Sequence, residues 1–276
     1  TLERIALEKA GIIKPGAVAI AAPQPSSEVI DVFQEVCTEK GVRLVSVSGD
    51  VSWQKESSSL DGQSFSARGL QGSYRLWIPL LGEHQLENVC TALATLEALR
   101  ERGFSISDEA IREGFRAVHW PGRLQVLMHN GRTLVVDGAH NPYSMKKLVE
   151  ALRSYFSFKG VVAIFGALSG HNLAEMASEL ASLSPVVIAA RSRHPRAVAN
   201  SAVIEAFAGQ GIQVALETED VGEATRRALE MARDGDLVIG TGSLLVAAEV
   251  IEAVRRMPPE LYPTLQRPVV KPSIVV

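Results

Sequence analysis

The stretch Leu134-Val135-Val136-Asp137-Gly138-Ala139-His140-Asn141-Pro142 decides how the second half of this chain folds. A short apolar run ends in a cluster of Asp, Gly, His, Asn and Pro, and a helical pattern over residues 143–156 follows. This is the order of a buried strand, a polar turn and a helix in an α/β unit. Ligands of open α/β sheets bind beyond the carboxyl ends of the strands, where polar side chains and free helix N–H groups meet. We therefore expect function at Asp137 and His140.

A purely structural role for this turn is the alternative. Asp137 and Asn141 are residue types that cap helices, and Pro142 suits the first turn of a helix. The spacing of these residues does not choose between helix capping and ligand binding.

Alternating strands and helices continue the pattern on both sides of the turn. The expected strands are residues 124–128, 134–137, 161–165, 186–190, 214–216 and 237–239. Asn130-Gly131 between the first two is a strong signal for a β-hairpin. The other strands alternate with helices and should therefore be parallel. The sequence predicts an α/β, Rossmann-like domain with a mostly parallel six-stranded sheet over residues 121–257.

Residues 1–120 have a different pattern. Helices are expected over residues 2–10, 26–40, 89–100 and 108–118, buried strands over 17–21 and 43–47, and a small antiparallel sheet from the alternating segments 63–68 and 74–78. His119-Trp120-Pro121-Gly122-Arg123 joins a helix to a strand through Pro-Gly, so we place a domain boundary after residue 120. Residues 258–276 are rich in proline and are expected to have no independent fold.

The composition excludes several classes of protein. The net charge of −3 gives no electrostatic case for binding nucleic acid or an anionic membrane. No apolar run approaches the roughly 20 residues of a membrane helix. Cys37 and Cys90 lie far apart in apolar helical contexts, as reduced core residues of a cytoplasmic protein do. The chain begins at Thr1 without Met, which is typical of a fragment or a cleavage product.

Polar residues gather after the predicted parallel strands. They are Asp137, His140 and Asn141; Gly166, Ser169, His171 and Asn172; Arg191, Arg193, His194 and Arg196; Glu217 and Glu219; and Gly240-Thr241-Gly242-Ser243. Three of the six histidines are among them. Arginines and helix N-termini at one edge of a sheet suit a carboxylate or a phosphate.

Several of these signals are weak when taken alone. Gly240-Thr241-Gly242-Ser243 lacks the Lys and the spacing of a phosphate-binding P-loop, and a tight helix start explains it as well. A helical Lys9 beside Glu8 is normally a surface residue. Asn88 is ordinarily a residue of a first helical turn, and Arg123 a linker residue in a salt bridge.

Six motifs in order resemble the folylpolyglutamate synthase and dihydrofolate synthase enzymes of the Mur ligase superfamily. They are Ile5–Gly16 (I-A-L-E-K-A-G-I-I-K-P-G), Gly82–Asn88 (G-E-H-Q-L-E-N), Pro121-Gly122-Arg123, Asp137–Pro142 (D-G-A-H-N-P), Phe165–Ser169 (F-G-A-L-S) and Thr241-Gly242-Ser243. The resemblance implies that residues 1–120 are the C-terminal portion of an ATP-binding central domain and that residues 121–257 are a glutamate ligase domain.

The resemblance also implies an activity, with ATP and Mg²⁺ as cofactors. ATP would phosphorylate a folate carboxylate, on tetrahydrofolyl-polyglutamate or dihydropteroate, and the amine of L-glutamate would attack the acyl phosphate. By residue, Lys9 matches a carbamylated lysine that binds the metal and is a catalytic residue. Asn88, Arg123 and Asp137 match contacts to the base, phosphate and ribose of ATP. His140 and Ser243 match positions that hold the incoming glutamate, His140 also as a catalytic residue.

Two departures from the family pattern limit this interpretation. The glycine-rich P-loop of the family is absent, and we expect it upstream of Thr1, so that this polypeptide alone should not turn over ATP. Gly170-His171-Asn172 stands where the family usually has Asp-Lys-Asp, which puts a role of that loop in doubt. The alternatives are a non-catalytic binding module of the same fold and a Mur-type ligase with another acceptor.

Overall fold

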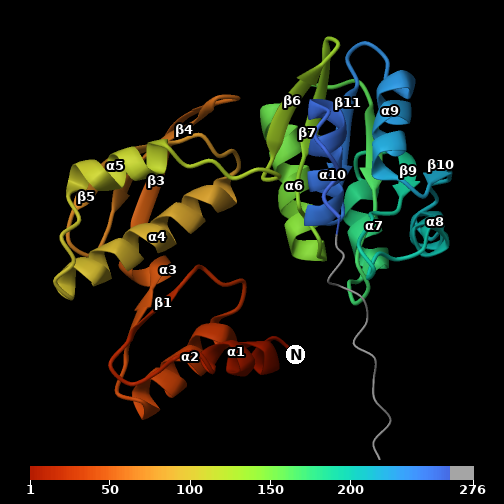
Figure 1. The fold of residues 1–276 in the computed structure, drawn as a ribbon. Coiled ribbons are helices and arrows are strands. Elements are labelled where there is room, and N and C mark those ends of the chain that lie inside the picture. Colours follow the sequence, from red (N-terminus) through yellow and green to blue (C-terminus); the bar gives the residue numbers. More distant parts are fainter. Residues whose placement is uncertain (262–276) are drawn as a thin grey trace, which may run out of the picture. The chain divides into compact units, whose positions relative to one another are not determined.

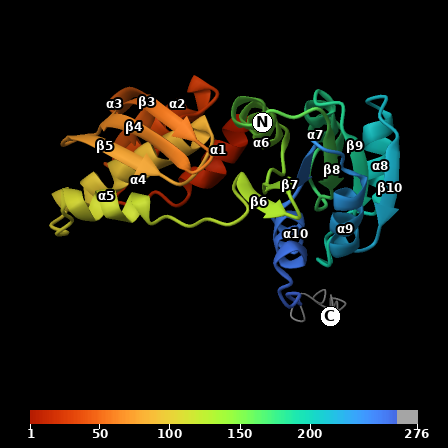
Figure 2. The ribbon, with the colours of Figure 1, turned by 90° about the horizontal axis from the view of Figure 1, so that it is seen from above.

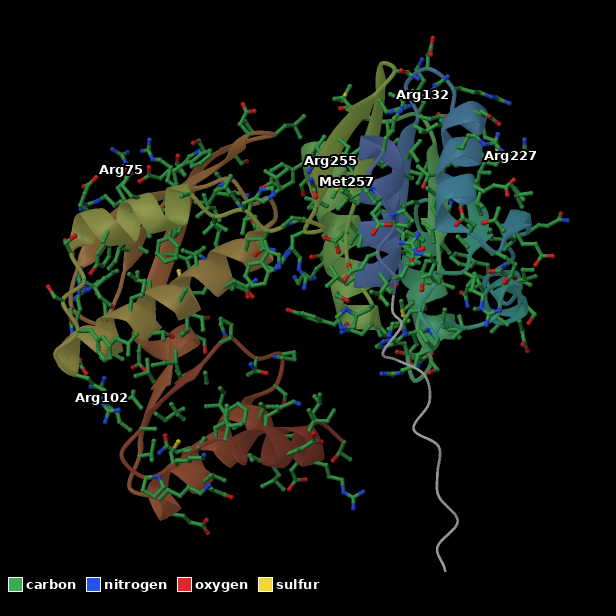
Figure 3. The ribbon with its side chains drawn as sticks, in the orientation of Figure 1. Arg75, Arg102, Arg132, Arg227, Arg255 and Met257 are labelled. Atoms are coloured by element: carbon green, nitrogen blue, oxygen red, sulfur yellow. The ribbon has the colours of Figure 1, made fainter. Side chains whose placement is uncertain are left out.

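The computed structural model describes residues 1–261, in two units that are Thr1–Trp120 and the chain from Pro121 onward. Each unit is described by itself. In both of them, side chains fill the space between the sheets and their helices (Figure 3). None of the helices within residues 1–261 is both long enough and apolar enough to cross a lipid bilayer. The remaining part of the predicted proline-rich tail, residues 262–276, lies outside the described residues.

The first unit begins with a small α/β layer. Strands β1 (Val18–Ala21) and β2 (Arg43–Ser46) pair in parallel, and helices α1 (Leu2–Ala10) and α2 (Ser27–Glu39) pack against each other beside them. Ser26 caps α2 through a hydrogen bond from the Glu28 N–H to its hydroxyl (3.3 Å). A short helix, α3 (Val47–Asp50), follows β2.

An antiparallel sheet and two helices complete the first unit. Strands β3 (Ser52–Ser59), β4 (Gly62–Arg68) and β5 (Ser73–Ile78) pair in sequence order. Helices α4 (Glu83–Glu101) and α5 (Asp108–Arg116) cover the sheet (Figure 1). The prediction of a small sheet was incomplete because it missed β3. The predicted start of α4 at residue 89 was also wrong, because the helix begins six residues earlier, at Glu83.

The second unit is built on the six-stranded sheet that the sequence predicts. The strands are β6 (Gln125–His129), β7 (Arg132–Val136), β8 (Val161–Phe165), β9 (Val186–Ala190), β10 (Val214–Thr218) and β11 (Leu237–Thr241). Their spatial order is β10-β9-β8-β11-β7-β6. Only the β6–β7 hairpin is antiparallel, so the predicted α/β class and mostly parallel sheet are confirmed. The position of Glu217 expected from the sequence, after β10, was wrong. β10 runs to Thr218, so Glu217 lies inside the strand.

Helices cover both faces of this sheet. On one face lie α6 (Pro142–Tyr155), α7 (Leu173–Ala181) and α8 (Asn200–Ala208), and on the other lie α9 (Val221–Met231) and α10 (Leu244–Arg255) (Figure 2). Burial on both faces explains why β8 and β11 are buried along their whole length, and why they are apolar except for Thr241 at the end of β11.

The position of β11 creates a switch point in the sheet. β11 lies between β7 and β8, although it follows both in the sequence. The chain leaves β7 and β8 toward α6 and α7 on one face, and it leaves β11 toward α10 on the other face. Strands whose connections diverge in this way leave a crevice at their carboxyl ends, which is where open α/β sheets bind ligands.

Candidate functional site

The carboxyl rim, defined here as residues 137–141, 166–172 and 241–243, follows β7, β8 and β11. The Asp137 N–H donates to the Gly240 carbonyl (3.0 Å), and the Gly166 N–H donates to the Thr241 carbonyl (3.3 Å). These bonds extend the strand pairing past the ends of the strands and fix the three segments side by side.

Close backbone packing within the rim requires glycine at two positions. A Cβ atom on Gly242 would come within 2.5 Å of the Gly166 carbonyl oxygen, and a Cβ on Gly166 within 2.0 Å of the Ala190 carbonyl oxygen. Gly242 also has φ +99°, in the region that favours glycine. The glycines of the F-G-A-L-S and T-G-S motifs are therefore explained by the approach of the strand ends to one another.

Asp137 ties the rim to the segment that precedes β6. Its Oδ2 accepts a hydrogen bond from the Leu124 N–H and its Oδ1 accepts one from the Ala139 N–H, both at 2.8 Å. The Gly138 N–H donates to the Gly122 carbonyl (2.8 Å), which adds a second bond between the two segments. Arg123 is half-buried and lies in the sequence between Gly122 and Leu124, which both bond to the rim. Asp137 therefore has a structural role, but it is not the helix capping considered from the sequence, because Asn141 caps α6.

The electrostatics of Asp137 follow from its position. The residue is buried, and burial raises the pKa of its carboxyl above the ordinary value. Hydrogen bonds from the two backbone N–H groups and the charges of Arg123 and His140 act in the opposite direction. Each carboxylate oxygen has used one acceptor direction, so each can still accept one hydrogen bond from a ligand hydroxyl.

His140 presents one free ring nitrogen at the rim. Its Nδ1 lies 2.9 Å from the Gly138 carbonyl oxygen, and a carbonyl can only accept, so Nδ1 carries the hydrogen. In the neutral ring, Nε2 is then the acceptor. The His171 ring packs edge-on against the His140 ring, with 5.3 Å between centroids. Burial lowers the pKa of His171, and the charges of His140 and Arg196 lower it further, so His171 favours its neutral form.

The residues that depart from the family pattern have local roles in this loop. Gly170 has φ +94°, a conformation that an Asp or Lys adopts only with strain. Asn172 caps α7 by accepting a hydrogen bond from the Glu175 N–H (3.2 Å). Gly170 and Asn172 therefore set the turn that brings His171 to His140.

Helices α6 and α10 both start at the rim. Asn141 caps α6 in a capping box with Ser144, and the Ser144 N–H donates to Asn141 Oδ1 at 2.8 Å. Ser243, which is buried, caps α10 by accepting a hydrogen bond from the Val246 N–H (3.1 Å). The Ser243 hydroxyl hydrogen remains available to donate.

Known proteins are similar to this chain in sequence and in architecture. Residues 122–244 match the family described as Mur ligase, glutamate ligase domain. Over these residues the chain is similar to that family, and the unit from Pro121 onward is called the glutamate ligase domain below.

Curated relatives that match most of the chain are named dihydrofolate synthase/folylpolyglutamate synthase. It is 27% identical over 253 residues to "Dihydrofolate synthase/folylpolyglutamate synthase" of Bacillus subtilis, covering 91% of this chain and 57% of the relative. It is 30% identical over 253 residues to the Escherichia coli protein of the same name, covering 91% and 55%. The chain thus spans somewhat more than half the length of these curated relatives.

Solved structures agree with these relatives. The Mycobacterium tuberculosis folylpolyglutamate synthase complexed with ADP superimposes with a TM-score of 0.81 at 26% identity, over 94% of this chain and 60% of that one. A folylpolyglutamate synthase/dihydrofolate synthase with Mn, AMPPNP and L-glutamate bound gives a TM-score of 0.71 at 27% identity, over 92% and 57%. The resemblance drawn from the six motifs is confirmed.

The arginine-rich loop after β9 of the glutamate ligase domain is largely neutralised. Arg191 pairs with Glu219 (3.2 Å), and Arg193 pairs with Glu249 (3.7 Å) and with Glu252. The Arg196 guanidinium donates to the Ser169 carbonyl (3.1 Å). The sequence predicted a basic rim, and this prediction is wrong for the loop after β9. Acidic side chains of the same domain pair with Arg191 and Arg193.

Two predicted site residues lie in the first unit, outside the glutamate ligase domain. Lys9 is exposed near the end of α1, and its Nζ lies 3.8 Å from Glu8 Oε1. Asn88 is exposed on α4 and donates to Gln85 Oε1 (3.1 Å), while the Gln85 amide contacts His84 (3.1 Å). The structure brings Asp137, His140 and Ser243 together on one rim and leaves Lys9 and Asn88 in the other unit.

The residues that the structure describes do not fit a magnesium site by themselves. Within residues 1–261, no three His, Cys, Asp or Glu side chains converge as metal ligands would. Lys9 makes an exposed ion pair with Glu8 rather than lying in a pocket with carboxylates. No catalytic step through Mg²⁺ can therefore be derived from these residues.

One polar group at the rim has an environment that the sequence does not indicate. Thr241, the last residue of β11, is fully buried, and its hydroxyl has no hydrogen-bond partner within residues 1–261. A buried hydroxyl without a partner is unusual in folded proteins. The sequence places Thr241 among the polar residues that follow the strands, but it does not indicate that its hydroxyl is buried without a partner.

Proposed function

We propose that this chain carries the part of an ATP-dependent ligase that holds L-glutamate and the adenosine group of ATP. In this proposal the enzyme adds L-glutamate to a folate, either a tetrahydrofolyl-polyglutamate or dihydropteroate. The observation that carries the proposal is the convergence of Asp137, His140 and Ser243 on one rim of a glutamate ligase domain. Homology to folylpolyglutamate and dihydrofolate synthases supports the substrate class.

The chemistry of the rim suits an amino acid substrate. The Ser243 hydroxyl can donate a hydrogen bond to a carboxylate of glutamate. His140 Nε2 can accept a hydrogen bond from a second polar group of glutamate, or it can take a proton from the glutamate amine. Only the deprotonated amine can attack an acyl phosphate, so a neutral imidazole at this position assists the reaction. Attack releases phosphate and forms the amide.

The nucleotide contacts rest on a second set of residues. Asp137 can accept a hydrogen bond from a ribose hydroxyl, and the neighbouring Arg123 guanidinium can bind a phosphate. Asn88 would contact the base and carbamylated Lys9 the metal, but these two assignments are supported only by motif correspondence. The relatives solved with ADP, with AMPPNP and with Mn support ATP and a divalent metal as cofactors of the enzyme.

Phosphate transfer requires residues that this sequence does not contain. The 276 residues have no G-x-x-x-x-G-K-[ST] segment to hold the β- and γ-phosphates. We propose that these residues bind ligands but do not turn over ATP alone, and that a P-loop half completes the site. The two free buried cysteines support a cytoplasmic location.

The experiment is an assay of ADP release by the 276-residue chain, with tetrahydrofolate or dihydropteroate and L-glutamate. No turnover is expected, and binding of ADP by equilibrium dialysis should persist. Turnover that survives purification to homogeneity would overturn the need for a P-loop half. Absence of ADP binding would favour a non-catalytic module of the same fold. A ligase with a different acceptor would bind ADP and L-glutamate equally well, so only acceptor screening with the completed enzyme tests the folate assignment.

A further inference from the structure

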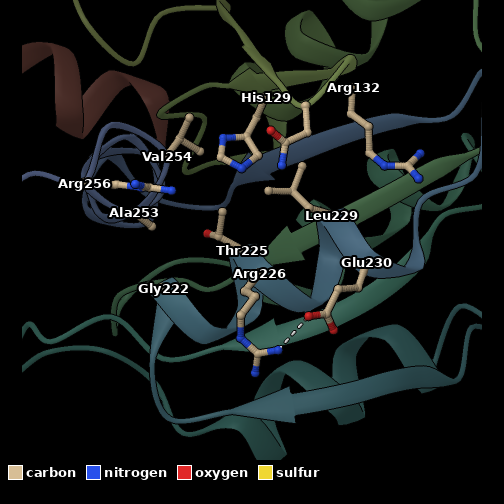
Figure 4. Close-up of a pocket in the computed structure, with 11 residues that line it drawn as sticks. His129, Arg132, Gly222, Thr225, Arg226, Leu229, Glu230, Ala253, Val254 and Arg256 are labelled. Atoms are coloured by element: carbon tan, nitrogen blue, oxygen red, sulfur yellow. Dashed lines mark hydrogen bonds and ion pairs between the residues drawn. The ribbon is translucent and has the colours of Figure 1, made fainter.

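A cavity lies in the glutamate ligase domain, at the opposite end of β7 from the rim. Its volume is about 450 Å³, and it is bounded by the β6–β7 hairpin, by α9 and by the end of α10 (Figure 4). The residues that matter for its chemistry are His129, Arg132, Arg226, Leu229, Val254 and Arg256. Known small-molecule sites have volumes of roughly 300–1,000 Å³, so the cavity has room for an organic molecule.

The floor of the cavity is apolar. Leu229 and Val254 are partly buried and pack against the core between the sheet and helices α9 and α10. The Thr225 hydroxyl donates to the Val221 carbonyl (2.8 Å), so this side chain is already satisfied. An apolar ligand body is therefore favoured at the centre of the cavity, away from its charged rim.

The charges around the cavity do not balance. Arg226 forms ion pairs with Glu230 (2.7 Å) and Glu223 (3.5 Å), and Glu230 also contacts Arg227 (3.4 Å), so these charges cancel. The carboxylate next to Arg132 is that of Asp234, at 3.9 Å and fully exposed, and such a pair contributes little in water. Arg256 forms no ion pair with any residue in the range 1–261. Two arginines are thus left to attract an anion.

Arg256 is held at the cavity by an uncommon backbone conformation. It caps α10 with φ +53° and ψ +41°, and its N–H bonds to the Ala253 and Glu252 carbonyls. Glycine is the usual residue at such a left-handed helix end, because other residues are strained there. Strain of this kind in a residue that lines a cavity is a reason to look for a ligand.

The cavity is separate from the rim but connected to it by two elements. β7 runs from Arg132 to the residue before Asp137, about 16 Å at ~3.3 Å per residue. Helix α10 runs from its cap Ser243 at the rim to Arg256 at the cavity. A ligand in the cavity would therefore contact the far ends of two elements that carry rim residues.

We propose that this cavity is a binding site for a small organic anion, a phosphate or carboxylate group on a compact apolar body. The planar guanidinium of arginine binds either anion in a bidentate manner, and Arg132 and Arg256 flank the apolar floor. Asn130 and His129 add polar groups from the hairpin. The site stands independently of the ligase activity proposed above.

The test is an amide NMR titration of the 276-residue chain with phenyl phosphate, benzoate and inorganic phosphate. Phenyl phosphate or benzoate should shift the amides of Asn130, Thr225 and Leu229 with saturation, and the stronger of the two identifies the anion. Inorganic phosphate, which lacks an apolar body, should bind more weakly. The proposal fails if neither organic anion shifts these amides, or if inorganic phosphate binds as tightly as both.

Substitutions localise the site. Arg132→Ala and Arg256→Gly should each weaken binding about tenfold or more, the expected effect of losing one charge-assisted hydrogen bond. Arg256→Gly also suits the left-handed backbone, so weaker binding by this variant cannot come from unfolding. Arg153→Ala, an exposed arginine on α6 across the sheet, is the matched control and should leave binding unchanged. Equal binding by all three variants would overturn the proposal, as would amide shifts that depend on protein concentration and not on the anion.

Discussion

The carboxylate of Asp137 accepts a hydrogen bond of 2.8 Å from the backbone N–H of Leu124, a buried leucine with φ +41°. A leucine rarely adopts this conformation, which costs roughly 1–2 kcal/mol. The bond holds the chain in the turn that leads from the Pro-Gly-Arg motif into β6. One side chain of the D-G-A-H-N-P motif therefore fixes the geometry of another motif.

Asp137→Asn should destabilise the glutamate ligase domain by about 2–3 kcal/mol, since both carboxylate oxygens accept buried backbone N–H groups. An amide has only one oxygen, so its NH₂ group would face one of these N–H donors. Urea unfolding followed by circular dichroism measures the change. Asp234→Asn, at a fully exposed position of the same unit, is the control and should stay within about 0.5 kcal/mol. A loss for Asp137→Asn no greater than that of the control would contradict the structural role.

Glu97→Ala should destabilise the first unit by about 3 kcal/mol. Its buried carboxylate accepts hydrogen bonds from Leu70 N–H (2.5 Å), Gln71 N–H (3.1 Å) and the Tyr74 hydroxyl (2.9 Å), which together hold the turn between β4 and β5. Compared with the wild type, the Glu97→Ala variant should show faster amide hydrogen exchange in β4 and β5 of the first unit. Exchange in β7 and β11 of the second unit should be unchanged. Glu113→Ala, on the exposed side of α5, gives the baseline. Uniform acceleration in both units would show that the carboxylate does not act locally.

Glu249→Gln should become more stable relative to the wild type as the pH rises. Burial raises the pKa of the Glu249 carboxyl, and the charges of Glu252 and Asp220 add to this, against the Arg193 N–H bond and guanidinium. A raised pKa in the folded state means that the carboxyl stabilises the fold fully below its unfolded value near 4.5 and loses this contribution as the pH rises through the folded value. Glutamine stays neutral and can still accept from Arg193 N–H (2.9 Å).

The measurement for Glu249 is urea unfolding of both proteins in steps between about pH 4 and pH 7. The difference in unfolding free energy should grow in favour of Glu249→Gln over this interval. A difference that stays constant would mean that the carboxyl titrates alike in the folded and unfolded states. A difference that shrinks would mean that the ion pair with Arg193 outweighs burial.

His140 should carry its hydrogen on Nδ1, because that nitrogen faces the Gly138 carbonyl. Nitrogen-15 NMR of the imidazole rings at neutral pH distinguishes the two tautomers. A hydrogen on Nε2 would place an acceptor against a carbonyl oxygen and would remove the free acceptor that we assign to the rim. His171 provides an internal comparison, because its ring packs against that of His140.

The sequence predicts the parts of the fold that depend on local signals. Asn130 and Gly131 have φ of +48° and +76°, as the hairpin signal requires, and Asn141 and Pro142 start α6. No local pattern indicates strand β3, because seven of its eight residues are exposed and it has no alternation of apolar and polar residues. Only its pairing with β4 makes it a strand. The start of α4 was missed because its first turns consist of polar residues that bond to one another.

Long-range order is the part of the site that local patterns do not contain. No sequence signal places β11 between β7 and β8, yet this insertion brings Ser243 to the same rim as Asp137 and His140. The pairing of Arg193 with Glu249, 56 residues away, likewise depends on the packing of α10 against the sheet. Sequence therefore identified the rim residues, while their charge balance came from tertiary contacts.

Binding of L-glutamate to this chain tests the central claim most directly. Titration of the 276-residue chain with L-glutamate, followed by amide NMR, should shift His140, Gly242 and Ser243, and Ser243→Ala should weaken binding about tenfold, as expected for a lost hydrogen bond to a charged group. Ser243→Ala also removes the cap of α10, so Ser107→Ala, which removes the cap of α5, serves as the matched control. Saturable shifts at the rim that Ser243→Ala weakens and Ser107→Ala leaves intact would support the account. Shifts confined to other parts of the chain, or equal binding by Ser243→Ala, would contradict it.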